Sequence, residues 1–183
     1  MTHNTFNFIG GNTGQWQVLN MNTLIGAPLQ NIANLQISPS NEITPDNGIW
    51  TLTGVISNLR YTEKQEKESL IAIQENLGRP LATCAALIPL RKSEAWWALA
   101  QDERRAIFEQ QSRHTQTGLK YLPAIARKLY HCRDIGGQFD FLTWFEFAPA
   151  DTDAFDELLA SLRQTEEWGF VDREVDIRLC KSH

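Results

Sequence analysis

The chain has 183 residues, enough for one ordinary domain or two small fused ones around a substantial buried core. With 42% hydrophobic and 21% charged residues, it has the composition of a globular protein. A net charge of −5 argues against nucleic-acid binding, which needs a basic surface, but leaves room for a local positive pocket that holds a small anion.

The N-terminal residues MTHNTFNFIGG lack the basic and apolar regions of a signal peptide. No stretch approaches the ~20 apolar residues of a membrane-spanning helix. The three cysteines, Cys84, Cys132 and Cys180, are odd in number and show no CxxC spacing, which disfavours a disulfide framework and a zinc site. These features predict a cytoplasmic protein with reduced thiols and no membrane partner.

Residues 1–60 predict β-strands separated by turns. The segments FNFIGG, QWQVLNM and GIWTLTGVI are alternating or β-branched, and GNTG, SPSN and TPDNG divide them. Over residues 62–77 the apolar period changes to that of an amphipathic helix, with Thr62 and Gln65 as a capping box. The tripeptide GRP at 78–80 ends this predicted helix.

The middle of the chain predicts a strand and then helices. Residues 81–91 are an apolar run suited to a buried strand. Ser93 is placed to cap a short helix that carries two adjacent tryptophans. Asp102 is placed to cap a longer helix over about 103–115, which we expect Gly118 to end.

Two residues of this region gain a predicted orientation from helical spacing. On the helix over 103–115, His114 lies seven residues after Ile107, so we expect it on the buried face. Pro123 predicts the start of a further helix, with Leu122 and Leu129 on its buried stripe.

The last third predicts two strands around a helix: residues 139–147 alternate, a helix runs from 151 or 152 to Arg163, and residues 171–179 alternate again. From residue 81 the order β–α–α–β–α–β indicates a ferredoxin-like α+β unit with one strand unassigned. The first 80 residues are consistent with an abbreviated copy. The predicted fold is therefore α+β, with ferredoxin-like halves at 1–80 and 81–183, of the dimeric α/β-barrel type.

His114 is the strongest candidate for chemistry. It has no second histidine four residues away, which excludes a zinc site of the HExxH type. Two interpretations stay open: a hydrogen-bonded core histidine, or a single axial ligand to haem iron. An axial ligand normally donates its other N–H to a carboxylate, and Glu166 and Glu167 are candidates for it.

Two cations also have alternative interpretations. Arg127 is either a surface arginine with a buried stem or a fork-shaped donor that holds a small oxyanion. Lys92 is either a solvated strand end or a charge that pairs with a haem propionate. Six tryptophans indicate either core and interface packing or a cluster near a redox cofactor.

Other catalytic motifs are absent from the sequence. It has no GxSxG, no GxGxxG after a predicted strand and no phosphate-binding GK[ST] loop. The acidic residues at 151–157 lack the spacing of an EF-hand.

Three long runs carry a resemblance to a known family. WWALAQDERRAIFEQQSRH, LPAIARKLYHCRDIGGQFDFLTWFEFAP and LRQTEEWGFVDREVDIRL resemble the chlorite dismutase family of haem proteins. The resemblance covers roughly residues 58–183, beginning with SNLRY, and the short N-terminal part looks like the compact, dimeric lineage. It implies haem b (iron protoporphyrin IX) bound in the C-terminal half, a homodimer, and decomposition of chlorite to chloride and dioxygen.

The resemblance also implies roles for particular residues. His114 matches the proximal haem ligand, Glu167 the carboxylate that accepts its hydrogen bond, and Lys92 a basic residue linked to this pair. Arg127 matches the mobile distal arginine of chlorite-degrading members, and so the catalytic residue. The other implied positions are Trp96 near the haem, Trp97 at the subunit interface, Arg60, Tyr61 and the backbone of Ile88 at the propionates, and Gln74, Leu122 and Phe145 on the distal side.

The competing branch of the same fold is the coproheme decarboxylases, which resemble this chain around IPLRK at 88–92. Those enzymes carry a catalytic tyrosine where this chain has Ile88, and tend to have glutamine in place of Arg127. Both departures favour chlorite decomposition. A haem-binding carrier or sensor without chlorite turnover, and a structural protein without haem, are the alternatives from other classes.

Overall fold

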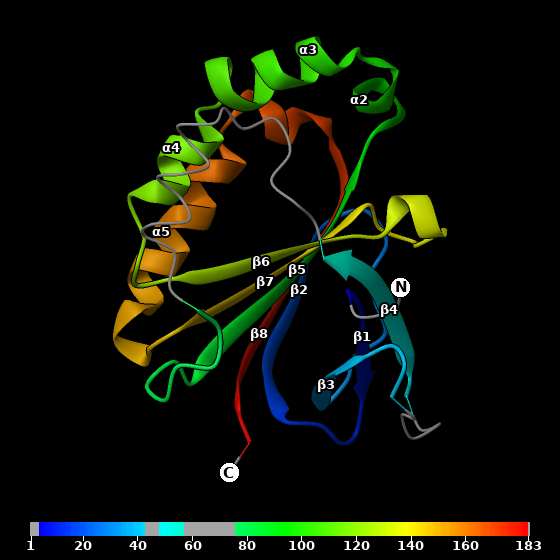
Figure 1. Cartoon of the computed structure of the whole chain (residues 1–183), viewed down its shortest axis with the longest axis vertical. Helices are drawn as coiled ribbons and strands as arrows, with labels where there is room; N and C mark the ends of the chain where they lie inside the picture. The colour runs from blue at the N-terminus through cyan, green and yellow to red at the C-terminus, as the bar shows by residue number, and fades with distance from the viewer. Residues whose placement is uncertain (1–3, 43–47, 57–75, 183) are drawn as a thin grey trace.

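The computed structural model describes residues 4–42, 48–56 and 76–182. In these residues, strands close into a single antiparallel barrel in the order β1-β3-β2-β8-β5-β7-β6-β4 (Figure 1). The first four strands are β1 (Thr5–Gly11), β2 (Trp16–Ile25), β3 (Asn34–Pro39) and β4 (Trp50–Ile56). The last four are β5 (Cys84–Lys92), β6 (Ala126–His131), β7 (Phe141–Phe147) and β8 (Val171–Lys181).

Strands from both ends of the chain share this barrel. β2 pairs with β8 on one side, and β4 pairs with β6 on the other, so the N-terminal strands complete a ring that the C-terminal strands begin. The strands predicted within residues 1–60, 81–91 and 171–179 are confirmed. The division into halves at residues 80 and 81 stays a prediction.

The barrel interior is a closed apolar core. Phe8, Leu35 and Leu142 are each 0% exposed, and the ring of Phe8 meets that of Tyr130 edge-on at 5.0 Å. Alternation along β5 and β8 sends every second side chain inward, since successive residues of a strand point to opposite faces. This core ties together strands that are far apart in the sequence.

Helices lie on one side of the barrel (Figure 1). They are α2 (Glu94–Ala98), α3 (Gln101–Arg105), α4 (His114–Leu119) and α5 (Thr152–Arg163), with a π-helical segment at Ala106–Gln111. Short 3₁₀ turns lie at Arg133–Ile135, Pro149–Asp151 and Glu166–Phe170. The predicted α5 is confirmed. Its Phe155 packs on Phe145 and Phe147 at 5.0 and 4.5 Å, which fixes the helix against β7. No helix among these described residues is long and apolar enough to cross a membrane.

The single long helix predicted over 103–115 is wrong. Ser93 does cap α2, but Ala100 rather than Asp102 precedes α3, and the helix breaks at Arg113, which adopts a left-handed φ of 50°. The Glu109 carboxylate accepts hydrogen bonds from the Thr115 backbone N–H, at 3.0 Å, and from its hydroxyl. A side chain thus takes the place of a helical carbonyl, and α4 starts afresh at His114. α4 ends at Leu119, so Gly118 is not its stop.

The helix predicted after Pro123 is also wrong, because residues 126–131 form β6. This strand pairs along its length with β7 and closes the barrel onto β4, so tertiary pairing outweighs the helical spacing of the apolar residues. β6 is the strand that the predicted βααβαβ order lacked. Phe139 precedes β7 and packs in the barrel core, rather than sharing a face with Phe141. The helix predicted over 62–77 lies almost wholly outside the described residues.

Candidate functional site

A large pocket separates the helices from the outer face of β5, β6 and β7. It is partly open to solvent. Most of its lining is apolar, including Ile88, Leu90, Tyr121, Ile125, Phe145 and Leu159. The pocket therefore has the character of a site for a mostly apolar group.

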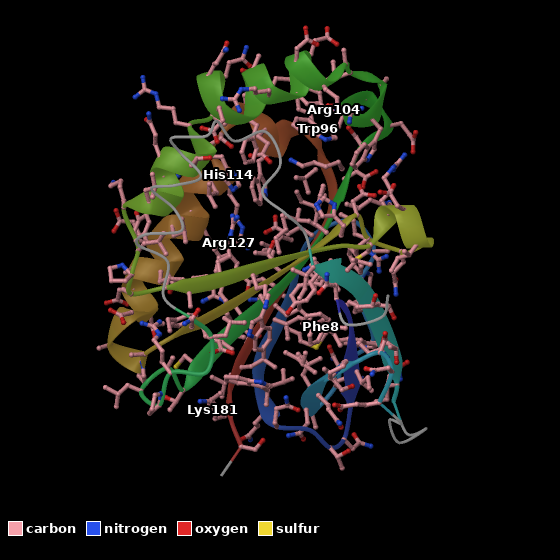
Figure 2. All side chains as sticks on the ribbon, in the orientation of Figure 1. Phe8, Trp96, Arg104, His114, Arg127 and Lys181 are labelled. Atoms are coloured by element: carbon pink, nitrogen blue, oxygen red, sulfur yellow. The ribbon has the colours of Figure 1, made fainter. Side chains whose placement is uncertain are left out.

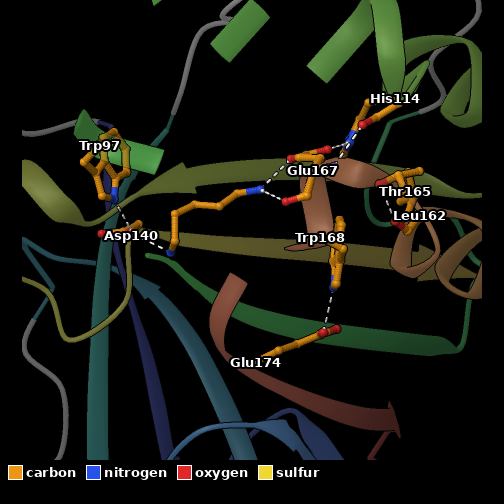
Figure 3. A network of polar contacts seen from close by, with 10 residues as sticks. Trp97, His114, Asp140, Leu162, Thr165, Glu167, Trp168 and Glu174 are labelled. Atoms are coloured by element: carbon orange, nitrogen blue, oxygen red, sulfur yellow. Dashed lines mark hydrogen bonds and ion pairs between the residues drawn. The ribbon is translucent and has the colours of Figure 1, made fainter. Parts of the chain in front are cut away.

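His114 lines this pocket as the first residue of α4. Its Nδ1 lies 2.8 Å from Oε2 of Glu167 (Figure 3). The Phe108 ring stacks on the imidazole, with 4.3 Å between the ring centres. The helix break at Arg113 sets this position, because it starts α4 with the histidine at its first turn. His114 faces inward as predicted. Its orientation comes from the start of α4 after the break at Arg113, and not from one continuous helix over 103–115.

Glu167 is buried and holds several partners at once. It is 5% exposed, and its backbone N–H donates to Ser112 Oγ at 3.0 Å. Lys92 Nζ donates to Oε1 at 2.8 Å, while His114 meets the other carboxylate oxygen. Burial opposes ionisation of Glu167, but His114 and Lys92 outweigh it and lower its pKa to about 2. The carboxylate is therefore ionised throughout the physiological range.

An ionised Glu167 determines the tautomer of His114. A carboxylate only accepts hydrogen bonds, so the proton between the two side chains sits on Nδ1 of the imidazole. Nε2 of the neutral ring then carries the lone pair that a metal ion needs. Among residues 4–42, 48–56 and 76–182 no group of three or more His, Cys, Asp or Glu side chains is placed to hold a metal by itself. His114 could therefore hold a metal-containing cofactor through Nε2.

Lys92 ends β5 beneath the same pocket. It is 5% exposed, so the interpretation as a solvated strand end is wrong. Its ammonium lies 4.5 Å from the centre of the Trp96 ring and 5.6 Å from that of Trp168, as in a cation–π contact. Burial lowers the pKa of Lys92, and the charge of Glu167 acts against that shift.

Asp140 extends this network and was not identified from the sequence. Its Oδ2 accepts from the Lys92 backbone N–H at 2.7 Å and from Trp97 Nε1 at 3.0 Å. Figure 3 shows Trp97 and Asp140 at one end of the network and His114 with Glu167 at the other. An aspartate between phenylalanines in the run FDF was the available signal, because a carboxylate in an apolar strand needs partners. Trp97 is half-buried against its own chain, and its interface role stays a prediction.

Arg127 reaches the pocket from β6, opposite Phe145 in the β7 register. Figure 2 places its side chain below His114, in the space under α4. Burial lowers the pKa of the guanidinium, and the Glu167 carboxylate opposes that shift. Strand alternation explains the placement: Arg127, Leu129 and His131 line the pocket, while Tyr130 joins the barrel core.

The other predicted positions divide into two groups. Trp96, Ile88, Leu122 and Phe145 all line the pocket. The hydrogen-bond ladder from β5 to β8 is interrupted between Leu87 and Leu90, where Pro89 has no N–H to donate. The predictions for Arg60, Tyr61 and Gln74 lie outside the described residues. Phe108 and Trp168, which also line the pocket, were not assigned a role from the sequence.

The fold and pocket define an α+β barrel protein in which the His114 imidazole and the Arg127 guanidinium face one mostly apolar cavity. The sequence model of the family described as "Chlorite dismutase" matches residues 40–183. The chain therefore belongs to the chlorite dismutase family. The match begins earlier than the resemblance noted from residue 58.

Individual relatives agree with this assignment. A dimeric chlorite dismutase from Nitrobacter winogradskyi is 54% identical, with a TM-score of 0.91, over 97% of this chain and 99% of that one. A mutant chlorite dismutase from Candidatus Nitrospira defluvii is 20% identical, with a TM-score of 0.69, over 100% of this chain and 92% of that one, which shows a shared fold.

The chlorite dismutase of Ideonella dechloratans is a curated relative, 32% identical over 124 residues. That match covers 64% of this chain and 40% of the relative, so the aligned part spans about two fifths of the relative's length.

Proposed function

We propose that this chain is a haem b oxidoreductase that decomposes chlorite to chloride and dioxygen. The observation that carries the proposal is one pocket with two different walls. One wall presents His114, held by the ionised Glu167, and the other presents the Arg127 guanidinium. Family membership and the 54% identity to a dimeric chlorite dismutase support it.

The residues present fit a haem. The Nδ1 proton of His114 is engaged by a carboxylate, so Nε2 would be free to hold the haem iron. Trp96, Ile88 and Phe145 would supply apolar contact for a porphyrin. A bound haem supplies an iron centre with an open coordination site for oxygen-atom chemistry on chlorite.

Arg127 is the residue that we assign to the substrate. A permanently charged fork in a pocket of low dielectric attracts a small anion and keeps an anionic fragment from leaving before the reaction ends. The apolar side chains beside it, Leu129 and Phe145, exclude water and so strengthen that attraction.

Glu167 and Lys92 fix the orientation of the His114 imidazole and raise its basicity. Glu167 accepts the Nδ1 proton of His114, which fixes the ring and raises the basicity of Nε2. Lys92 binds the second oxygen of the same carboxylate and so restrains its orientation. Neither residue needs to touch chlorite to affect its turnover.

The decarboxylase alternative requires a phenol that this pocket lacks at the corresponding place. Ile88 stands there, 2% exposed and lining the pocket, and its side chain has no ionisable or redox-active group. The carrier or sensor alternative requires no arginine at position 127. The observed pair of His114 and Arg127 in one cavity favours turnover over storage.

An oxygen electrode distinguishes these functions. Chlorite added to the haem-loaded protein should release one dioxygen per chlorite, with chloride as the other product. An intact haem spectrum without oxygen release would support a carrier, whereas failure to develop a Soret band on haem addition would indicate a structural protein. The decarboxylase alternative is tested by adding coproheme and using mass spectrometry to detect the loss of its carboxylate groups.

Arg127→Ala tests the assigned role of the guanidinium. We expect the variant to keep its haem, to raise the KM for chlorite about tenfold, equivalent to about 1.4 kcal/mol, and to inactivate after fewer turnovers. Arg127→Lys is the matched control, since it keeps the positive charge without the forked guanidinium. Its KM and its number of turnovers should lie between those of the wild type and of Arg127→Ala. A wild-type KM and lifetime in Arg127→Ala would contradict the role.

We also propose a homodimer with two ferredoxin-like halves, in accord with the dimeric relative that matches nearly the whole chain. Light scattering of the purified protein at two concentrations tests the dimer. The cytoplasmic location, and chlorite rather than another oxidant as the physiological substrate, stay predictions from the sequence.

A further inference from the structure

Two cysteines face each other across the pairing of β5 and β8. Cys84 is the register partner of Cys180 in this antiparallel ladder. The Lys181 N–H donates to the Thr83 carbonyl at 2.9 Å, which makes 83 and 181 a hydrogen-bonded pair. The next pair, Cys84 and Cys180, is therefore a non-hydrogen-bonded one, the type in which opposed Cα atoms approach to ~4.5 Å.

The two thiols also lie on the same face of the sheet. Ala85 and Leu179, the neighbouring pair, point into the barrel core. Since successive strand residues alternate, Cys84 and Cys180 both point outward, and Cys84 packs against the core cluster under α5. A disulfide needs Cα atoms within roughly 4.4–6.8 Å and side chains that converge. The register of β5 and β8 meets both conditions.

The pair differs from the third cysteine in its environment. Cys84 and Cys180 are free and half-buried, whereas Cys132 is buried, 2% exposed, inside the barrel. Cys132 packs between Gly54 and Gly137, where an added Cβ would stand 3.2 and 2.7 Å from its side-chain atoms. Burial raises the pKa of the Cys132 thiol to about 12. Cys132 therefore serves as an internal control for thiol reactivity.

We propose that Cys84 and Cys180 are a dithiol that accepts a two-electron oxidant of the hypochlorous acid class and closes to an intramolecular disulfide. One thiol takes the chlorine of hypochlorous acid as a sulfenyl chloride and water leaves. The second thiol then attacks that sulfur, which forms the S–S bond and expels chloride and a proton. Two thiols lose two electrons in total, and the chlorine atom of hypochlorous acid gains them.

The position of the pair fits the consumption of an oxidant that has left the active site. Cys84 begins β5 and Lys92 ends it, so the thiols lie at the end of the strand remote from the His114 network. A disulfide there links strands that are already paired and moves none of the pocket residues. That the oxidant arises from chlorite turnover rests on the proposed function, whereas the closing of the disulfide does not.

The chemistry of the thiols limits which oxidants react. Burial and the neighbouring Cys180 raise the pKa of Cys84, so little thiolate is present at neutral pH. Oxidants that react slowly and require a thiolate, such as hydrogen peroxide, are therefore expected to close the pair far more slowly than hypochlorite. Raising the pH should reduce the difference in rate between hydrogen peroxide and hypochlorite, because more thiolate is then present.

The test adds reagent hypochlorite to the haem-loaded protein, one equivalent per chain, without any chlorite. Thiol titration should fall from three groups to one, and peptide mapping should give a single species that joins the Cys84 and Cys180 peptides, lighter by two hydrogens. Reduction with dithiothreitol should restore both thiols. Cys84→Ser and Cys180→Ser are matched controls, and each should lose the joined species while it keeps the wild-type haem spectrum.

Several outcomes would overturn the proposal: separate sulfinic or sulfonic acids on the two residues, a disulfide between two chains, or loss of Cys132 while the pair stays reduced. A second readout is the melting temperature, which closure of a long loop should raise by about 5 °C or more. An unchanged melting temperature in a fully joined sample would likewise count against a native-like link. Because no chlorite is used, these results are independent of the oxygen-electrode assay.

Discussion

The two faces of the β5–β7 sheet contrast strongly. The inner face closes on an apolar barrel core in which Phe8, Trp144 and Leu142 are almost fully buried. The outer face, under the helices, holds a pocket bordered by Lys92, Glu167 and the Arg127 guanidinium. The same strands serve both, because alternate side chains point to opposite sides. One face stabilises the fold, and the other assembles the chemistry.

The contrast shows how charge is accommodated in each place. At the edge of the apolar barrel core, Trp144 donates to Oε1 of the Glu146 carboxylate at 2.9 Å, and the Gly78 backbone N–H donates to Oε2 at 2.6 Å. At the pocket, Glu167 has His114 and Lys92 as partners, and Asp140 holds Lys92 and Trp97. Buried charges persist where each is paired and hydrogen-bonded. Substitutions on either face should therefore have different consequences for stability.

The largest expected effect comes from breaking the inner face. Phe8→Ala removes a ring that is 0% exposed and that contacts Tyr130 and Trp144. We expect a loss of about 3–5 kcal/mol in the free energy of unfolding, measured by urea denaturation. Leu19→Ala, at a side chain 62% exposed, is the control and should stay within about 0.5 kcal/mol. A small effect of Phe8→Ala would contradict a tightly packed barrel core.

The next largest effect concerns the outer face and its pH dependence. The pKa of Glu167 is about 2 in the folded chain, below its ordinary value of 4.5. Its contribution, about 3 kcal/mol, is therefore present above pH ~4.5 and is lost as the pH falls towards 2. Glu167→Gln should remove that contribution at neutral pH and flatten the acid limb of the stability curve.

Urea unfolding at about pH 7, 4 and 2.5, followed by circular dichroism, measures this difference across the range in which the contribution is lost. Glu166→Gln is the matched control, since it makes the same chemical change at the exposed neighbouring residue. Equal pH dependence in the two variants would show that Glu167 is not held ionised by His114 and Lys92.

A smaller effect is expected from the far end of the network. Asp140→Asn removes the negative charge of a side chain whose Oδ2 accepts from the Lys92 backbone N–H and from Trp97 Nε1 and whose Oδ1 pairs with Arg133 at 3.4 Å. The amide oxygen can still accept from the first two donors, but the ion pair with Arg133 is lost. We expect a loss of about 1–2 kcal/mol by urea denaturation. Asp134→Asn, on the exposed turn beside it, should be nearly neutral. A loss as large as that in Glu167→Gln would mean that Asp140 is an equal centre of the network.

Residue patterns predicted the secondary structure correctly where the spacing of apolar residues matches the face that the element buries. The amphipathic stripe of Phe155, Leu158 and Leu162 predicted α5, and alternation predicted β8. The same approach failed at residues 126–131, whose apolar residues suit a helix but whose backbone pairs with β7 and β4. It also failed at Arg113, because the Glu109 side chain that interrupts the helix acts through a contact that spacing does not encode.

The candidate site shows the same limit. The sequence singled out His114, Glu167, Lys92 and Arg127, through motifs that resemble one family. It did not show that the first three share one hydrogen-bonded chain, nor that Asp140 continues it. These partners come from strands and turns distant in sequence, and only their folding together sets the distances.

By itself, the sequence determined the α+β character, the family and the residues that we propose to hold a haem and an anion. The tertiary structure alone decided that Arg127 stands on a strand, that the strands of both ends close one barrel, and that Glu167 is ionised in a buried site. The physical reason is that local patterns record which side chains favour burial or a given backbone. Strand pairing, desolvation and ion pairing depend on neighbours that the chain brings together only when it folds.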